Sequence, residues 1–473
     1  MLFNSLSFCL FFPVVTLLYF FVPHRTRWGM LLSASCIFYM AFVPSYILIL
    51  GFTIVIDYFA GLLITSATGN RRKVWLIASL VANVGVLCVF KYWGFFEANV
   101  GAVAGWLGSP NPIPALNILL PIGLSFHTFQ AMSYTIEVYR GNQPAEKHFG
   151  IYALYVMFYP QLVAGPIERP QNLLQQFHEE HRFNYAQAVS GLQQMALGMF
   201  KKIVIADRLA LAANGGVWEN PAQHHGIELI AAILCFAFQI YLDFSAYSDI
   251  ALGSARVMGF DLMKNFDTPY ASHSVSEFWR RWHVSLSTWF RDYVYVPLGG
   301  SRVGTLRRWR NLMVVFILSG LWHGANWTFL IWGALHGAYL IVGQATQGLR
   351  NRAAASLRWK DDSFSRGAVR VVITFSLVSF AWIFFRAPTL NVALEMVSGL
   401  PNGLWTDLLA LSRGYAVGTL TPASLGLRVA LIAAVVVFEA FHRRRNVFVR
   451  LMDVPAPLRH AAYAALIYGT IFL

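Results

Sequence analysis

The amino-acid sequence predicts an all-α protein that crosses a membrane many times. Of its 473 residues, 57% are hydrophobic and only 12% are charged, whereas soluble domains contain about 25% charged residues. A helix needs about 20 apolar residues to cross a bilayer, and apolar stretches near this length recur along the whole chain. Short basic clusters separate several of them, as expected for cytoplasmic loops under the positive-inside rule.

The candidate spans can be placed in order along the chain. Because some of them are short or interrupted, we expect about eleven to thirteen true spans, with the others re-entrant. The first 22 residues lack a basic leader and a small-residue cleavage site, so they are interpreted as a retained first span. The candidates are residues 5–22, 30–46, 47–66, 74–92, 116–138, 150–165, 188–213, 227–250, 311–330, 331–346, 368–386, 427–441 and 457–473.

The basic clusters also predict an orientation. If His24–Arg27 lies in the cytoplasm, the N-terminus lies outside, Arg71–Lys73 lies inside, and the Gly/Pro-rich segment 93–115 forms an external loop. No predicted loop exceeds about 60 residues, so a separate soluble domain is not expected. We therefore predict one membrane-embedded domain over residues 1–473, with its core at about 116–345, and a separate partner for any work outside the membrane.

Two stretches do not fit the simple pattern of spans. Residues 158–170 contain three prolines and a glycine within an apolar run, and non-helical backbone is tolerated at membrane depth only inside protein or beside a water-filled cavity. Residues 261–310 are both aromatic and basic, and predict helices that lie in the interface or dip into it. Within them, Glu277 and Arg281 have the spacing of an i,i+4 ion pair. The alternative interpretation is a belt of Trp and Arg anchors at the headgroups.

The strongest candidate for chemistry is His323, in the segment Ser319-Gly-Leu-Trp-His-Gly-Ala-Asn-Trp327. An ionisable side chain within an apolar span is a functional hypothesis by default, and histidine titrates near neutral pH. The alternative is a packed histidine that bonds Ser319 or Asn326. His336 is assigned to helix packing. His127 is also intramembrane, but no second polar feature accompanies it in the sequence.

Several other kinds of protein are disfavoured. The net charge of +14 could suggest a nucleic-acid partner, but the basic residues lie in loops between spans, so none is expected. The four cysteines are widely spaced and predict neither disulfides nor a zinc site, and no metal is expected. Phosphate-binding glycine loops, zinc-protease helices and serine-nucleophile elbows are absent from the sequence. The functions that remain are acid–base chemistry centred on a histidine, or transport.

An acyl-coenzyme A donor would require cations near the cytoplasmic mouth of the site, because its phosphates bind Lys and Arg. The residues available are Lys201, Lys202, Arg280, Arg281 and Arg291. Each of them could equally be an ordinary interfacial anchor.

Eight segments of the chain resemble the membrane-bound O-acyltransferases, in particular the bacterial branch that contains the alginate O-acetyltransferase membrane subunit. The matching segments are Leu120-Pro-Ile-Gly-Leu-Ser125, Tyr134-Thr-Ile-Glu-Val-Tyr-Arg-Gly141, Val163-Ala-Gly-Pro-Ile167, Phe200-Lys-Lys-Ile-Val-Ile-Ala-Asp207, Tyr241-Leu-Asp-Phe-Ser-Ala-Tyr-Ser-Asp249, Asn265-Phe-Asp-Thr-Pro-Tyr270, Glu277-Phe-Trp-Arg-Arg-Trp-His-Val-Ser-Leu-Ser-Thr-Trp289 and Gly320-Leu-Trp-His-Gly-Ala325. Beyond Arg386 no family motif is recognised.

The resemblance implies a fold, a reaction and site residues. It implies a ring of transmembrane helices around a central layer of tilted and re-entrant helices. His323 is then the essential histidine and His283 its assistant. The donor is cytoplasmic acetyl-coenzyme A, with no permanently bound cofactor, and we expect Arg280, Arg281, Trp322 and Asn326 to bind it.

We therefore expect a multi-pass protein of the bacterial inner membrane, surrounded by its lipids. The resemblance implies that the acetyl group passes across the membrane to an extracytoplasmic acetyltransferase partner, which modifies an exported polysaccharide. Alginate is the first candidate, and cellulose or another glycan the second. The alternatives are a lipid-directed acyltransferase and a transporter without covalent chemistry, although the paired internal repeats typical of many transporters are not found in the sequence.

Overall fold

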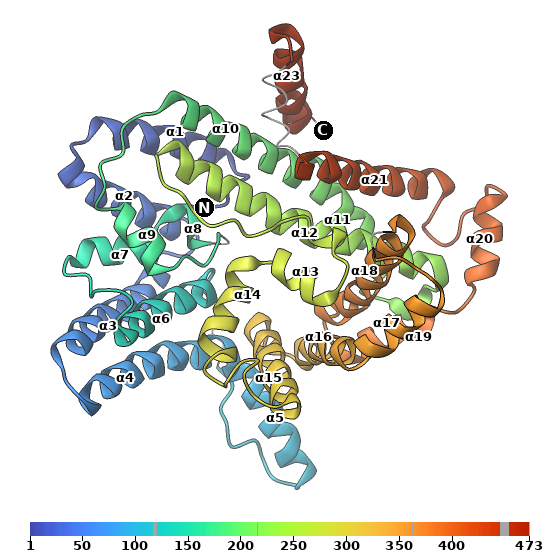
Figure 1. The fold of residues 1–473 in the computed structure, drawn as a ribbon, viewed down its shortest axis with the longest axis horizontal. Coiled ribbons are helices and arrows are strands. Elements are labelled where there is room, and N and C mark those ends of the chain that lie inside the picture. The colour runs from blue at the N-terminus through green and yellow to red at the C-terminus, as the bar shows by residue number, and fades with distance from the viewer. Residues whose placement is uncertain (117–120, 164, 215, 362, 445–453, 473) are drawn as a thin grey trace. The chain divides into compact units, whose positions relative to one another are not determined.

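The computed structural model describes the whole chain except residues 117–120, 164, 215, 362, 445–453 and 473, and it is built from helices (Figure 1). Within the described residues, the sole β pairing is an isolated bridge between Val417 and Leu420. The prediction of an all-α protein is confirmed. The chain forms two compact units, residues 1–198 with 247–264 and residues 199–246 with 265–473.

The first unit contains the N-terminal helices. They are α1 (Leu6–Phe21), α2 (His24–Met40), α3 (Tyr46–Ser66), α4 (Asn70–Leu87), α5 (Trp93–Trp106), α6 (Leu124–Arg140), α7 (Phe149–Met157), α8 (Tyr159–Leu162), α9 (Pro170–Gln176) and most of α10 (Tyr185–Phe200).

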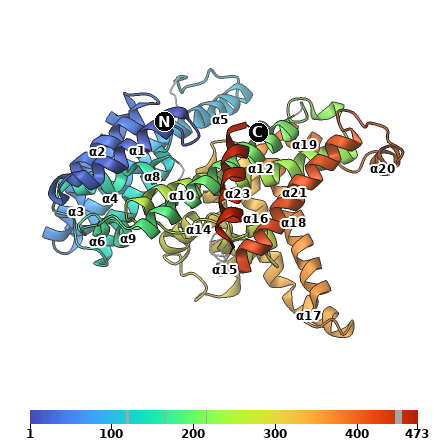
Figure 2. The same cartoon turned by 90° about the horizontal axis from the view of Figure 1, so that it is seen from above.

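The second unit contains the helices that bear the predicted histidines. They are α11 (Asp207–Asn214), most of α12 (Gly226–Val257), α13 (Val275–Arg281), α14 (Val284–Phe290), α15 (Thr305–His323), α16 (Trp327–Ala345), α17 (Gln347–Ser356), α18 (Phe364–Arg386), α19 (Leu390–Gly399), α20 (Leu404–Ser412), α21 (Pro422–Arg444) and α23 (Ala456–Phe472). Figure 2 shows α17 at the ends of α16 and α18, where the chain passes from one of these helices to the other.

Several helices are long and apolar enough to cross a membrane, so the protein is a multi-pass membrane protein. Six in the described part of the chain meet both criteria: 46–66, 70–106, 226–257, 327–345, 364–386 and 422–441. Many of their exposed side chains are apolar, as lipid contact requires; Leu48 and Phe52 of α3, for example, are 73% and 55% exposed. The expected total of eleven to thirteen spans, and their arrangement as a ring, stay predictions.

The prediction of an external loop over residues 93–115 is wrong for its first part. A π-helical turn, Cys88–Tyr92, joins α4 directly to α5, so helix continues from Asn70 to Trp106. The three prolines of this segment lie at 110, 112 and 114, beyond Gly108, where the backbone has a positive φ of 71°. Glycines alone weaken a helix but do not terminate it, and the segment before the prolines is apolar enough to remain helical.

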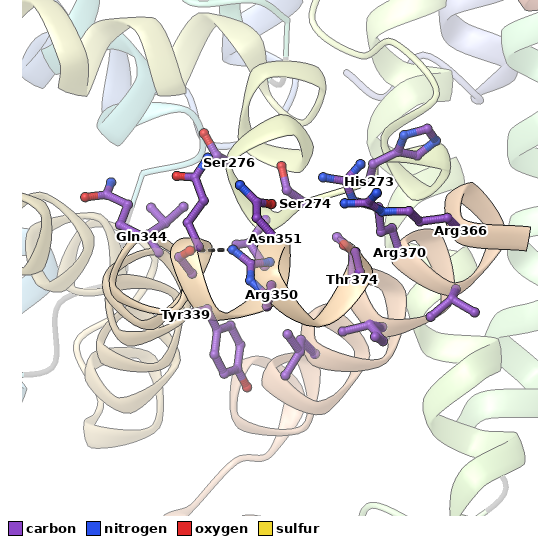
Figure 3. A pocket seen from close by; sticks show the side chains of 18 of the residues that line it. His273, Ser274, Ser276, Tyr339, Gln344, Arg350, Asn351, Arg366, Arg370 and Thr374 are labelled. Atoms are coloured by element: carbon purple, nitrogen blue, oxygen red, sulfur yellow. Dashed lines mark hydrogen bonds between the residues drawn. The ribbon is translucent and has the colours of Figure 1, made fainter. Parts of the chain in front are cut away.

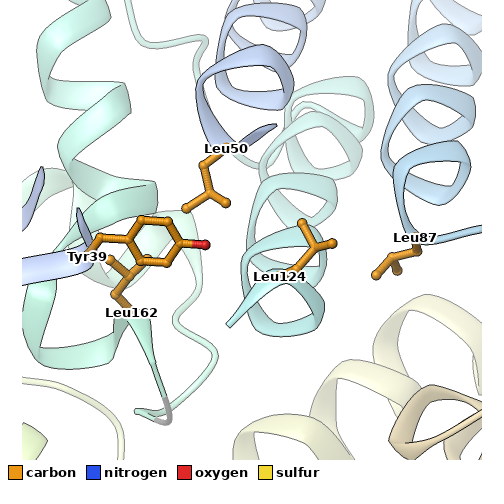
Figure 4. Close-up of a cluster of buried hydrophobic side chains, with 5 residues drawn as sticks. All are labelled: Tyr39, Leu50, Leu87, Leu124 and Leu162. Carbon is orange, nitrogen blue, oxygen red and sulfur yellow. The ribbon is translucent and has the colours of Figure 1, made fainter. Parts of the chain in front are cut away.

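The first unit packs around leucines contributed by α3, α4 and α6. Leu50, Leu87 and Leu124 are each no more than 5% exposed and form one cluster with Tyr39 and Leu162 (Figure 4). These residues are far apart in the sequence, so the cluster ties α2 and α8 to α3, α4 and α6. Because lipid is as apolar as leucine, the cluster stabilises this unit through close packing and not through removal of apolar surface from water.

A polar network also lies inside the first unit. Asp57 on α3 accepts hydrogen bonds from Ser79 at 2.6 Å and from the Asn83 amide at 2.9 Å. One turn earlier on α3, the Thr53 hydroxyl lies 2.6 Å from His127 Nε2 on α6. The expectation that His127 has no polar companion is therefore wrong, because its partner Thr53 lies 74 residues away in the sequence.

The proline-rich segment 158–170 is stabilised by side chains, as buried irregular backbone requires. The Gln130 amide donates to the Tyr155 carbonyl at 2.6 Å, and the Tyr155 hydroxyl donates to the Glu168 carbonyl at 3.0 Å. The Glu168 carboxylate, fully buried, accepts from the Met263 backbone N–H at 2.5 Å. The break in the helix is thus built into the interior of the first unit.

In the second unit, α15 and α16 form a hairpin that packs with unusually close backbones. A Cβ added to Gly320 would lie 2.2 Å from the carbonyl oxygen of Phe329, and one added to Gly333 would lie 2.2 Å from that of Phe316. Small residues allow such an approach between membrane helices. The two glycines therefore set the separation of α15 and α16, and with it the position of His323 at the end of α15.

We expect Gly333→Ala to destabilise the protein. The added methyl group cannot be accommodated without moving α15 away from α16, and overpacking of this kind costs about 1–3 kcal/mol. Thermal unfolding of the purified protein in detergent should show a lower midpoint. Gly343→Ala, on the same helix but with nothing within 4 Å of the added Cβ, is the control; equal midpoints for the two variants would contradict the role of Gly333.

Candidate functional site

His323 is the last residue of α15, and the chain turns sharply after it. Gly324 ends the helix in an extended conformation, and a Cβ there would lie 2.1 Å from the Phe329 ring. Asn326 then begins α16 by accepting a hydrogen bond from the Thr328 N–H at 3.0 Å. The imidazole therefore stands at the carboxyl end of a helix, where the macrodipole favours a positive charge.

Aromatic rings form the walls around His323. Its ring centroid lies 4.8 Å from that of Trp322, 5.1 Å from Trp332 and 5.1 Å from Phe385. These rings come from α15, α16 and α18, so three helices are needed to build the enclosure. His323 is only half-buried, which leaves part of the imidazole accessible to a reactant.

His283 lies in the tight turn between α13 and α14 and is 1% exposed. Its φ of 44° lies in the left-handed region, which costs a residue other than glycine roughly 1–2 kcal/mol and is frequent at functional sites. Its Nδ1 lies 3.1 Å from Asn265 Oδ1. Its ring centroid is 6.3 Å from Trp322, so one indole contacts both His283 and His323. The structure thus brings together the two histidines singled out in the sequence.

The aromatic segment around His283 is buried. Phe278, Trp279, Trp282 and Trp289 are each no more than 9% exposed, and α13 packs on α16 and α18. The interpretation of these tryptophans as headgroup anchors is therefore wrong, because the two short helices α13 and α14 turn them into the protein. The predicted pair of Glu277 and Arg281 is confirmed at 2.5 Å.

The four residues expected to bind the donor lie in different environments. Arg281 is paired with Glu277. Trp322 is buried between the two histidines. Asn326 caps α16 and donates to the Pro388 carbonyl at 2.9 Å. Arg280 alone among them is exposed and lines a cavity.

Two of the other candidate cations are neutralised by local carboxylates. Lys202 Nζ lies 2.8 Å from Asp207 and 2.7 Å from Asp243. Arg291 lies 2.7 Å from the neighbouring Asp292. These contacts reduce the charge that either side chain can offer to a phosphate.

The cavity has a volume of about 610 Å³ and is bordered by α13, α16, α17 and α18 (Figure 3). Four arginines lie around it, and none of the described residues that line it is acidic. Asp361, outside the lining, is 3.0 Å from Arg366 and 3.8 Å from Arg370. The charged and polar lining comprises Arg280, Arg350, Arg366, Arg370, His273, Ser274, Ser276, Tyr339, Gln344, Gln347, Asn351 and Thr374. This excess of positive charge suits a polyanionic ligand.

Sequence reasoning did not find Arg350, Arg366 and Arg370. They lie outside the motifs, and nothing in the sequence shows that Arg350 of α17 and Arg366 and Arg370 of α18 lie around the same cavity as Arg280. The run of arginines between residues 350 and 370 was an available signal. It was indistinguishable from the other basic clusters that lie between the predicted spans.

His336 has the packing role assigned to it. It is fully buried, stacks on Phe278 with an interplanar angle of 7°, and accepts a hydrogen bond from the Trp279 indole N–H at 3.2 Å. One turn further along α16, Tyr339 lines the arginine-rich cavity. The helix therefore links the surroundings of His323 with the cavity.

The protein is helical and multi-pass, and two of its histidines contact the same buried indole. These are the features of an enzyme that works at membrane depth. The sequence assigns it to a family: the chain belongs to the membrane-bound O-acyltransferases, whose family model matches residues 147–386, including both histidines. It is therefore an acyltransferase of the membrane.

Its relatives include enzymes named for three different polymers: alginate, peptidoglycan and teichoic acid. The chain is 40% identical to the probable alginate O-acetylase AlgI of Pseudomonas aeruginosa over 90% of its own length and 81% of that protein. It is 35% identical to the peptidoglycan O-acetyltransferase of Helicobacter pylori over 85% and 80% of the two chains. The teichoic acid D-alanyltransferase of Streptococcus thermophilus is 27% identical over 60% and 69%.

The different burial of the histidines can be tested without assuming any reaction. We expect diethyl pyrocarbonate to modify His323, which is half-buried, much faster than His283 and His336, which are at most 1% exposed. Peptide mass mapping of the folded protein in detergent measures the three rates separately. After denaturation the rates should converge; equal rates in the folded protein would contradict the enclosure described here.

Proposed function

We propose that this protein takes the acetyl group from cytoplasmic acetyl-coenzyme A and passes it across the bacterial inner membrane to an extracytoplasmic partner that O-acetylates an exported polysaccharide. The observation that carries the proposal is the contact of His283 and His323 with the same indole, inside the stretch that defines the family. Similarity to the alginate O-acetylase favours alginate as the polymer. Similarity to the peptidoglycan enzyme makes peptidoglycan the alternative.

In the proposed reaction, His323 acts as the general base. It removes the proton from the attacking hydroxyl as the oxygen bonds to the thioester carbonyl, and the carbon–sulfur bond then breaks. The protonated imidazole returns the proton to the departing thiolate, so the products are an acetyl ester and free coenzyme A. The carboxyl end of α15 stabilises the transient positive charge on the imidazole. His283 orients one of the reactants.

The arginine-rich cavity is the proposed binding site for the phosphates of coenzyme A. Arginine binds phosphate oxygens with paired, charge-assisted hydrogen bonds, and Arg280, Arg350, Arg366 and Arg370 surround the space. Trp332, which contacts His323, and Tyr339, which lines the cavity, are seven residues apart on α16, or about 10 Å along the helix. The pantetheine arm of coenzyme A can span such a distance.

We expect His323→Ala to abolish polysaccharide acetylation, because the attacking hydroxyl loses its base. The variant should be tested in cells that lack the native gene, with ester-linked acetate on the exported polymer as the readout, so that the partner is present. His178→Ala, at a histidine whose side chain is 51% exposed, is the control. The His323→Ala protein must also be extracted in normal yield and unfold at the normal midpoint, so that the loss of acetylation cannot be due to misfolding. Normal acetylation by His323→Ala would reject the assignment.

We expect Arg350→Ala to raise the KM for acetyl-coenzyme A by about tenfold or more with little change in kcat. The reason is that a hydrogen bond to a charged group contributes about 1.5–3 kcal/mol. Label transfer from acetyl-coenzyme A in inside-out membrane vesicles gives both constants. Arg352→Ala, an exposed arginine of the same helix that does not line the cavity, should retain the wild-type KM. Equal KM values for the two variants would place the donor elsewhere.

A further inference from the structure

Asn265 is a buried residue for which the proposed reaction has no role so far, and its side chain binds the turn that carries His283. It is 1% exposed. Its Oδ1 lies 3.1 Å from His283 Nδ1, 3.2 Å from the Ser285 backbone nitrogen and 2.9 Å from the Ser285 hydroxyl. Three polar groups of the turn thus converge on one amide oxygen.

The contacts of Asn265 determine which way its amide is oriented. A backbone N–H can only donate, so the atom that faces the Ser285 nitrogen must be the amide oxygen and not the amide nitrogen. The same oxygen faces His283 Nδ1. Because a carbonyl oxygen can only accept, Nδ1 must carry the hydrogen. A neutral imidazole has one N–H, and Nε2 therefore has the lone pair.

The backbone of Asn265 holds the same turn. Its carbonyl accepts from the Val284 N–H at 2.9 Å, and the Asp267 N–H donates to the Arg281 carbonyl at 2.9 Å. These bonds flank His283 on both sides and help to hold it in its left-handed conformation. Main chain and side chain of one residue therefore set both the position of the imidazole and the placement of its proton.

We propose that Asn265 is a positioning residue that holds His283 as the Nδ1–H tautomer, so that His283 offers Nε2 to a reactant as a hydrogen-bond acceptor. This inference rests on the proposed function, because it describes how His283 orients a reactant. It commits His283 to groups that donate, such as an amide N–H of the pantetheine arm, because the single proton of the attacking hydroxyl goes to His323. The ring cannot donate to the thioester oxygen through Nε2 while it is neutral.

The test compares three variants in inside-out vesicles supplied with labelled acetyl-coenzyme A. Asn265→Leu has a similar volume but no acceptor, and should lower kcat by about tenfold or more, which corresponds to 1.4 kcal/mol.

Asn265→Asp keeps an acceptor and should retain more activity, but its carboxylate stabilises the protonated imidazole. The acid limb of its kcat/KM profile should therefore move to higher pH. Ser285→Ala leaves the backbone N–H in place and should resemble wild type.

A double-mutant cycle separates positioning from a purely structural role. If Asn265 acts through His283, Asn265→Leu should have little further effect on kcat in a His283→Gln background. An equal further loss in that background, an unshifted acid limb for Asn265→Asp, or wild-type kcat for Asn265→Leu would each overturn the proposal.

The tautomer can also be read without any assay of activity. In protein labelled with ¹⁵N-histidine, the resonances lost in His283→Gln should show a protonated Nδ1 and an unprotonated Nε2. The opposite pattern would reject the inference even if the enzyme is active. If wild-type vesicles transfer no acetyl group while the expected tautomer is seen, the proposed function fails and the positioning of His283 by Asn265 stands.

Discussion

The close approach of α15 to α16 is the contact on which the candidate site depends. Gly320 and Gly333 let the two backbones meet without side chains between them, and this places His323 at the turn beside Trp332. Membrane helices gain little from hydrophobic burial against one another, because lipid is equally apolar, and depend on such close packing instead. The position of the imidazole is therefore set by backbone geometry, with aromatic rings filling the space around it.

The second constraint is that polar groups away from water need partners within the protein. Two buried breaks in helical structure meet it through a side chain that contacts more than one polar group. The Glu168 carboxylate accepts from the Met263 backbone N–H and the Asn172 amide beside the proline-rich segment of the first unit. Asn265 Oδ1 faces the Ser285 backbone N–H and two side-chain groups at the left-handed turn of the second unit. In the second case the requirement also orients an imidazole, so one hydrogen-bond arrangement serves both folding and the site.

The second unit separates two chemical environments along α16. Around His323 the walls are aromatic, and surroundings of low polarity strengthen charge interactions. Around Arg350, Arg366 and Arg370 the cavity is polar and positively charged. A donor with a charged head and a slender thioester arm matches this division, because its charge need not enter the apolar part of the protein.

The sequence by itself determined that the protein is helical and multi-pass, because hydrophobic segments of bilayer length are a local property that needs no knowledge of distant contacts. It also singled out His323, since a histidine within an apolar run is conspicuous, and the resemblance of the motifs to the family added His283. Only the tertiary structure decided what these residues touch. These contacts join residues distant in the chain: His283 with Trp322, the arginines of α17 and α18 with Arg280 around one cavity, Thr53 with His127, and Asn265 with His283. Pairings of this kind arise from packing between helices, for which a single sequence carries no periodic signal.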